Sequence, residues 1–226
     1  MCNYCVDLKT GSCNMPSGRI IFLNGTSSAG KTTLAYELQE RFEIPFNHVA
    51  LDQFRDGLPD KFRGLNAPVG SNGERGLNVV PETNCQPPYT RVAFGVDGKK
   101  MLRGMRRAMA AMVQSGNNII VDDIILEAEF LSDYLEVFAP FDVYFVGVRC
   151  PKTVINQREQ ARPGRFPGTA VGHFDVCHQH DCYDVEVDTS VSTPTLCAEK
   201  IVEYMTANRP FAFEALRQRQ ELSLQQ

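Results

Sequence analysis

A glycine-rich stretch near the start of the chain has the residue types and spacing of a phosphate-binding loop. Residues 25–32 read GTSSAGKT and fit the pattern G-x-x-x-x-G-K-[ST]. In this pattern backbone N–H groups surround phosphate oxygens, the lysine reaches the terminal phosphates and the hydroxyl binds Mg²⁺. We expect Lys31 to act in catalysis and Thr32 to hold the metal. The residues expected to bind the phosphates of ATP are Gly25, Thr26, Ser27, Ser28, Ala29, Gly30, Lys31, Thr32 and Thr33.

Three aspartates follow apolar runs of strand length. Asp52 directly follows residues 48–51, and Asp122 and Asp123 follow residues 118–121. The carboxyl ends of parallel strands meet at one edge of a sheet, so we expect all three beside the phosphate loop. Asp52 would be the base that takes a proton from an attacking hydroxyl, or else the N-cap of a helix around Gln53. Either Asp122 or Asp123 would hold Mg²⁺, because adjacent strand residues point to opposite faces.

Three arginines cluster later in the chain. Arg158 and Arg162 lie four residues apart on one expected helix face, and Arg165 follows a Pro-Gly break. Guanidinium groups bind phosphate oxygens well, so we expect these arginines to act in catalysis from a lid over residues 158–170. A solvated basic helix face is the alternative interpretation.

The elements that must position these residues alternate along the chain. Strands are expected at 19–24, 48–51, 118–121, 143–148 and 183–187, and helices at 31–42, 100–114, 127–138, 152–161, 195–206 and 211–222. Most strand-like runs are continuously apolar, as in parallel sheets covered on both faces. The pattern predicts an α/β fold of the P-loop NTPase type, with a parallel sheet of about five strands flanked by helices.

Two segments do not follow this alternation of strands and helices. Residues 1–18 are polar and aperiodic and are expected to form an N-terminal extension to a domain spanning 19–226. Residues 55–98 are rich in proline and glycine, which is typical either of a disordered excursion or of a substrate-binding insert.

Cysteine and histidine give only a weak metal signal. The eight cysteines are scattered, so we interpret them as free thiols. Cys2 and Cys5 form an isolated C-x-x-C, and residues 173–182 hold a local His/Cys cluster. No second pair lies at zinc-ribbon spacing from Cys2 and Cys5. The cluster could bind zinc on spacing alone, but it leads directly into the strand at 183–187 and no second structural clue supports a ligand set.

The bulk composition narrows the class of partner. The formal net charge is −4 and no block of Lys or Arg occurs, which argues against nucleic-acid binding. No apolar run approaches the roughly 18 residues of a membrane span, and we expect a cytoplasmic protein. Small molecules are the expected partners, and the sequence leaves the oligomeric state open.

Taken in order, the motifs resemble the chloramphenicol phosphotransferase-like family of P-loop kinases. The resemblance runs from Arg19 to about Tyr204 and rests on IIFLNGTSSAGKTTLA, HVALDQF, GNNIIVDDIIL, FVGVRCPKTVINQREQARPGRFPGTA and YDVEVDTS. It implies that Asp52 is the base acting on a primary hydroxyl. It also assigns the phosphate loop's lysine and hydroxyl roles to Lys31 and Thr32. The lid-arginine role falls on Arg158, Arg162 and Arg165.

The sequence therefore predicts an ATP- and Mg²⁺-dependent O-phosphotransferase acting on a hydroxyl of chloramphenicol or of another small molecule. Three alternatives remain: a nucleotide, nucleoside or shikimate-type metabolite kinase, a nucleotide-binding regulatory protein without acceptor chemistry, and a structural protein with an inactive loop. The absence of an N-K-x-D motif and the position of Asp52 weigh against the regulatory protein.

Overall fold

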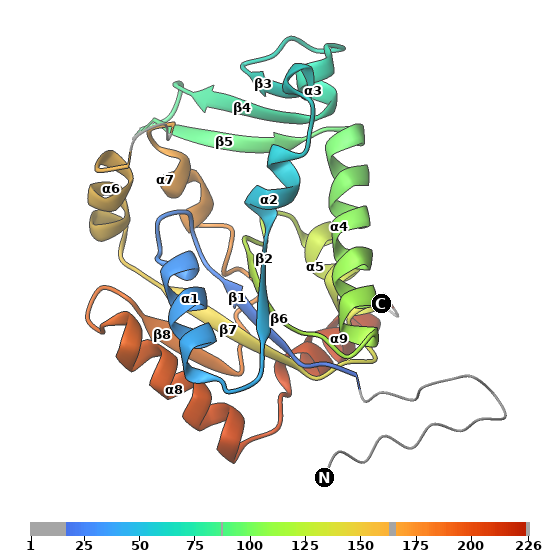
Figure 1. The fold of residues 1–226 in the computed structure, drawn as a ribbon. Coiled ribbons are helices and arrows are strands. Elements are labelled where there is room, and N and C mark those ends of the chain that lie inside the picture. Colours follow the sequence, from blue (N-terminus) through green and yellow to red (C-terminus); the bar gives the residue numbers. More distant parts are fainter. Residues whose placement is uncertain (1–16, 87, 163–165, 225–226) are drawn as a thin grey trace, which may run out of the picture.

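The core of the molecule is a five-stranded parallel sheet (Figure 1). The computed structural model describes residues 17–86, 88–162 and 166–224. The strands run in the order β2-β6-β1-β7-β8. Their bounds are β1 (Ile20–Asn24), β2 (Phe46–Ala50), β6 (Asn118–Asp123), β7 (Val143–Arg149) and β8 (Val185–Asp188). The predicted fold class is confirmed.

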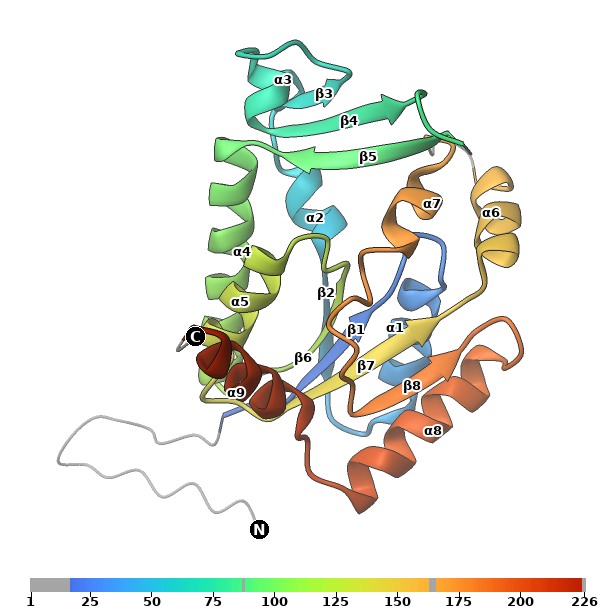
Figure 2. The same cartoon turned by 180° about the vertical axis from the view of Figure 1, so that it is seen from behind.

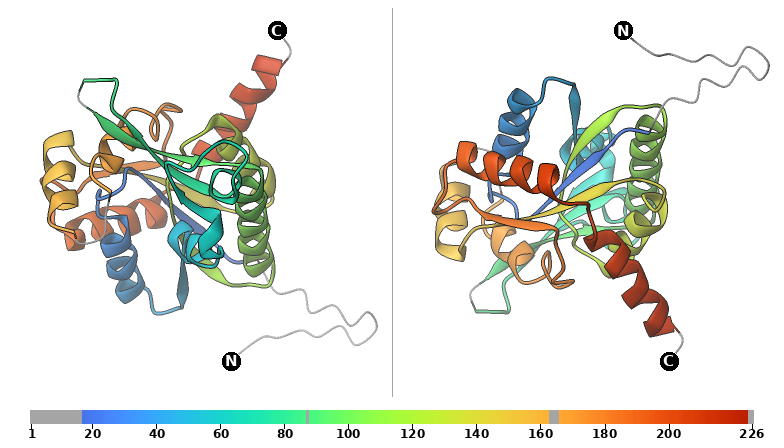
Figure 3. Two further views of the ribbon diagram at one scale, coloured as in Figure 1. Left: turned by 90° about the horizontal axis from the view of Figure 1, so that it is seen from above. Right: turned by 90° about the horizontal axis from the view of Figure 1, so that it is seen from below.

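Helices cover both faces of this sheet because its strands are apolar on both faces. Ile20 and Phe22 of β1 pack into one buried cluster, and Ile21 and Leu23 pack into the other. The first cluster lies under α4 (Val96–Gln114), α5 (Ala128–Val137) and α9 (Ala212–Leu224). The second lies under α1 (Lys31–Arg41), α6 (Lys152–Gln160) and α8 (Pro194–Ala207). Figure 3 shows α9 extending from the body of the molecule toward the C-terminus.

The register of the sheet brings the predicted site residues to one edge. Asn24, the last residue of β1, pairs with Asp123, and Ala50, the last residue of β2, pairs with Asp122. The phosphate loop, the aspartate pair and the start of α2 (Leu51–Asp56) therefore meet at the carboxyl ends of the strands.

Residues 55–98, for which the sequence left a disordered excursion and a substrate-binding insert as alternatives, contain a second, three-stranded sheet. After α2 come a 3₁₀ turn (Asp60–Phe62), β3 (Arg63–Leu65), α3 (Asn72–Arg75), β4 (Leu77–Glu82) and β5 (Tyr89–Phe94). β3 pairs parallel with β4, and β4 pairs antiparallel with β5. Figures 1 and 2 show this small sheet above the carboxyl edge of the main sheet, with α2 and α4 joining the two.

The small sheet also docks on α7 (Thr169–Phe174), which sequence analysis did not predict. The Thr90 hydroxyl donates to the Pro167 carbonyl over 2.7 Å, and the Thr90 amide donates to the Gly168 carbonyl over 3.1 Å. A Cβ atom on Gly172 would lie only 2.5 Å from the Thr90 carbonyl oxygen. Backbone therefore approaches backbone at a distance that only glycine permits.

Several element boundaries differ from those predicted. The second strand ends at Ala50 rather than residue 51, because the chain turns directly into α2. The last strand is Val185–Asp188 rather than 183–187, and α4 begins at Val96, ahead of the predicted residue 100. Residues 1–16 of the predicted extension, including Cys2 and Cys5, lie outside the described residues. In the described ranges we find no helix that combines the length and apolar character needed to cross a membrane.

Two helical glycines give a matched test of the docking on α7. Gly172→Ala places a methyl group against the Thr90 carbonyl and is expected to lower the free energy of unfolding by about 1–3 kcal/mol. Gly104→Ala lies in open space on α4 and should raise it by about 0.5–1 kcal/mol, because alanine loses less entropy on folding. Urea denaturation measures both. Equal stabilisation by the two substitutions would contradict the docking.

Candidate active site

The phosphate loop joins β1 to α1 in a strongly curved conformation. Ser28 and Gly30 adopt φ angles of 62° and 92°, and Gly30 is the N-cap of α1. The helix therefore directs its N-terminal amides and the positive end of its dipole into the loop. The Thr26 and Ser28 hydroxyls are buried and have no hydrogen-bond partner among the described residues. Buried, unsatisfied hydroxyls inside a curved loop at a helix N-terminus fit phosphate oxygens.

Lys31 folds back over this loop. Its Nζ atom donates to the Gly25 carbonyl over 3.0 Å and to the Thr26 carbonyl over 2.9 Å. It also lies 3.8 Å from Asp122 Oδ1. A buried ammonium group is thus held where the predicted terminal phosphates would lie.

Asp122, at the carboxyl end of β6, contacts both α1 and the neighbouring strand β2. Its Oδ2 atom accepts a hydrogen bond from the Thr32 hydroxyl over 2.6 Å and lies 3.4 Å from His48 Nε2. Burial raises the pKa of this carboxyl, but His48, the charge of Lys31 and the Thr32 hydroxyl outweigh that effect and hold the pKa below its ordinary value. Asp122 is therefore a buried, ionised carboxylate beside a hydroxyl, and oxygens of this kind suit Mg²⁺.

Asp123 points to the opposite face of the sheet. It accepts a hydrogen bond from the Tyr134 hydroxyl of α5 and one of 2.7 Å from the Ile124 amide. Complete burial raises its pKa, although these two donors act in the other direction. Strand alternation thus directs the two predicted metal ligands differently: Asp122 contacts Lys31 and Thr32, whereas Asp123 bonds Tyr134 of α5 and also borders the cavity.

Asp52 lies in the first turn of α2. The N-cap of α2 is Ala50, whose amide donates to the Gln53 side chain over 2.9 Å, so Asp52 is not the N-cap. Asp52 Oδ1 accepts a hydrogen bond of 2.7 Å from Arg55, and the Asp52 side chain is 47% exposed. The carboxylate is thus accessible from the same cavity as the phosphate loop.

The predicted lid arginines have different surroundings. Arg158, in the last turn of α6, donates to the Thr189 hydroxyl and carbonyl over 3.0 and 2.7 Å and approaches the Ala29 carbonyl at 3.5 Å. It therefore ties α6 to the phosphate loop and to the segment after β8. Arg162 is exposed and lines the cavity. Arg165 lies outside the described residues.

The His/Cys cluster packs behind the phosphate loop. Buried Asn24 directly precedes Gly25, and its amide donates to the Cys177 carbonyl and the Tyr183 hydroxyl over 2.6 and 2.7 Å. His180 Nε2 lies 3.2 Å from the same amide, and His178 contacts Tyr183. These side chains fix the end of β1, and no group of three potential metal ligands occurs within residues 17–86, 88–162 and 166–224.

A single cavity of about 630 Å³ contains the main groups described above. Its walls include Lys31, Thr32, Asp52, Asp122 and Arg162. No described residue of 55–98 lines it. A volume of this size suits a small-molecule site. The phosphate loop and the Thr32–Asp122 pair fit a nucleoside triphosphate with Mg²⁺, and Asp52 of α2 lines the same cavity.

Sequence reasoning missed His48 and Thr189. His48 lies two residues before the end of β2, so its side chain points to the same face as Ala50. Thr189 directly follows β8. A search for polar residues after every strand would have found Thr189. His48 lies in the middle of β2, and only the pairing of β2 with β6 places it beside Asp122.

A comparison with known protein families shows to which family the chain belongs. Residues 18–206 match the model of the family described as "Chloramphenicol phosphotransferase-like protein". The chain belongs to this family. Two strains of Mycobacterium tuberculosis have a protein named "Putative O-phosphotransferase" that is 32% identical over 216 residues, covering 91% of this chain and 90% of the relative. Membership in the chloramphenicol phosphotransferase-like family supports a phosphotransferase built on the P-loop kinase fold.

Solved structures support the fold of this family member. The APS kinase of Mycobacterium tuberculosis, in complex with AMPPNP and APS, has a TM-score of 0.58 at 16% identity and covers 84% of this chain and 99% of its own. A gluconokinase from Sinorhizobium meliloti has a TM-score of 0.54 at 13% identity, covering 90% and 98%. The tunicamycin resistance protein of Deinococcus radiodurans has a TM-score of 0.53 at 16% identity, covering 85% and 98%.

Two half-buried histidines behind the phosphate loop, His178 and His180, should make the stability of the protein depend on pH. Burial, together with the charge of Arg149, lowers the pKa of His178 from 6.5 to about 3. Below about pH 6.5 the unfolded chain therefore binds a proton at His178 that the folded chain does not, and stability falls as the pH falls. His178→Asn is expected to reduce the loss of unfolding free energy between about pH 7.5 and about pH 5. Urea denaturation at both values tests this, and an unchanged loss would contradict it.

Proposed function

We propose that the protein transfers the terminal phosphoryl group of ATP, bound with Mg²⁺, to a hydroxyl group of a small molecule. The observation that carries the proposal is the shared cavity, which is lined by Lys31, by the Thr32–Asp122 pair and by Asp52 of α2. ATP supplies the phosphoryl group, and the phosphorylated hydroxyl becomes a phosphate monoester. The family assignment supports the same class of reaction.

Each residue has a defined role in this proposal. The loop amides, the Thr26 and Ser28 hydroxyls and Lys31 would hold the phosphates. Thr32 and Asp122 would hold Mg²⁺. Asp52 would accept the proton that the acceptor hydroxyl loses, because its carboxylate lies at the accessible start of α2.

The three predicted lid arginines would have different roles toward the phosphates. Arg162 is exposed at the cavity and can reach an anionic ligand. Arg158 already bonds Thr189 and Ala29, so we propose that it supports the phosphate loop. Arg165 keeps the role that the resemblance implies.

Chloramphenicol is one candidate acceptor, because the family is named for its phosphorylation. The direct experiment measures ADP release with ATP and Mg²⁺ across chloramphenicol, other neutral alcohols, nucleosides and shikimate. Acceptor-dependent ADP release is expected for at least one hydroxyl compound. Tight ATP binding with no acceptor-dependent release would instead favour a nucleotide-binding regulatory protein.

Removing the ammonium group of the phosphate loop is expected to stop the reaction. Lys31→Ala should lower kcat/KM at least about a hundredfold, because the charge that neutralises the transferred phosphate is lost. Initial rates of ADP release measure the effect, and an unchanged melting temperature shows that the fold is intact. A variant with near-normal turnover would remove Lys31 from the mechanism.

The proposed base has a matched control on the same helix. Asp52→Asn should lower kcat by about 10²–10⁴-fold with little change in ATP affinity, because an amide cannot take the proton. Asp56 bonds the same Arg55 but does not line the cavity, so Asp56→Asn should turn over near the wild-type rate. If both variants lose kcat equally, the effect comes from Arg55 and not from proton transfer.

A further inference from the structure

The side chain of His48 faces the phosphate loop from the edge strand of the main sheet. In β2, His48 pairs with Ile120, and Ala50 pairs with Asp122. Residues two apart on a strand point to the same face, so His48 and Asp122 both face α1. The His48 side chain is only 9% exposed and lines the cavity.

The contact between the two side chains requires a specific tautomer. Asp122 Oδ2 already accepts the Thr32 hydroxyl over 2.6 Å, and His48 Nε2 lies 3.4 Å from the same oxygen. An ionised carboxylate only accepts hydrogen bonds, so Nε2 must carry the proton. Asp122 Oδ2 therefore has one donor from α1 and one from β2, while its Oδ1 atom faces Lys31.

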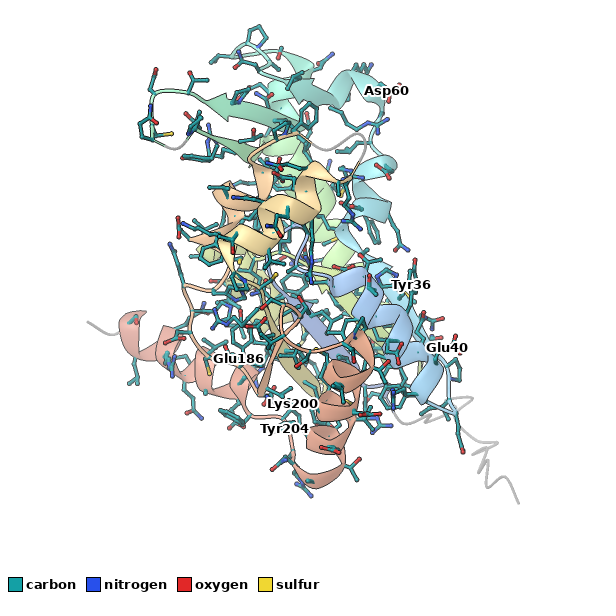
Figure 4. All side chains as sticks on the ribbon, turned by 90° about the vertical axis from the view of Figure 1, so that its left-hand side faces the viewer. Tyr36, Glu40, Asp60, Glu186, Lys200 and Tyr204 are labelled. Atoms are coloured by element: carbon teal, nitrogen blue, oxygen red, sulfur yellow. The ribbon has the colours of Figure 1, made fainter. Side chains whose placement is uncertain are left out.

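The imidazole of His48 also packs against Tyr36 of α1. The Tyr36 ring meets the His48 ring edge-to-face, with centroids 5.3 Å apart and an interplanar angle of 72°. Tyr36 lies one helical turn after Thr32, so one face of α1 contacts both Asp122 and His48. Figure 4 shows Tyr36 on α1, between Glu40 and the segment that carries Asp60.

We infer that His48 is a positioning residue that orients the Asp122 carboxylate for Mg²⁺. The inference rests on the phosphotransferase function proposed above. A buried carboxylate beside a metal needs donors that fix its orientation, and loss of such a donor typically weakens metal affinity by about 10–100-fold. His48 supplies such a donor from β2, and it shares Asp122 Oδ2 with the Thr32 hydroxyl of α1.

Direct metal binding tests this role without turnover. Mn²⁺ binding to the protein–ADP complex is followed by electron paramagnetic resonance for the wild type, His48→Leu and His48→Gln. His48→Leu removes the donor and should weaken Mn²⁺ binding by about tenfold or more, whereas the Gln amide can replace Nε2–H and should restore most of it. Asn47→Leu changes the residue of β2 directly before His48, on the opposite face, and should bind Mn²⁺ like the wild type.

A double-mutant cycle then asks whether His48 acts through Asp122. In the Asp122→Asn background, His48→Leu should cause almost no further loss of Mn²⁺ affinity. A full loss in that background would overturn the inference, as would wild-type Mn²⁺ affinity in His48→Leu with a raised KM for the acceptor. If the wild-type ADP complex itself binds no Mn²⁺, both the proposed metal site and the inferred role of His48 are overturned.

Discussion

The buried carboxylate of Asp122 is the constraint on which the site depends. A charge at 7% exposure is costly unless donors surround it, and here they come from α1 and from β2. Thr32 and Lys31 can reach Asp122 only if β1 and β6 are adjacent and in register, and His48 only if β2 follows β6. The order of the sheet and the position of α1 are therefore coupled through this one carboxylate.

The small sheet affects the site through the elements that it joins. It connects to the main sheet through α2, which carries Asp52, and it docks on α7, which follows the segment of Arg162. Glu159, next to Arg158, accepts hydrogen bonds from the amides of Gly168 and Ala170 and so holds α7 against α6. The small sheet and α7 thus connect the helix of the proposed base to the helix that carries Arg158.

The sequence predicted the features whose physical causes are local. A glycine-rich loop between an apolar strand and a helix, and carboxylates at strand ends, are recognisable without tertiary structure. The small sheet escaped prediction because β4 contains Pro81 and β5 is only partly buried, so neither shows the pattern of a buried parallel strand. His48 escaped because its contact depends on the pairing of β2 with β6, and the division between Asp122 and Asp123 depends on which helices cover each face.

Under the proposed function, this cavity transfers phosphate from ATP to a hydroxyl oxygen. Phosphorus NMR and mass spectrometry of the products of ATP, Mg²⁺ and an acceptor identified by ADP release test it most directly. A phosphate monoester should form on the acceptor in proportion to ADP and be absent with Lys31→Ala. Formation of inorganic phosphate in proportion to ADP, with the acceptor unchanged, would contradict it.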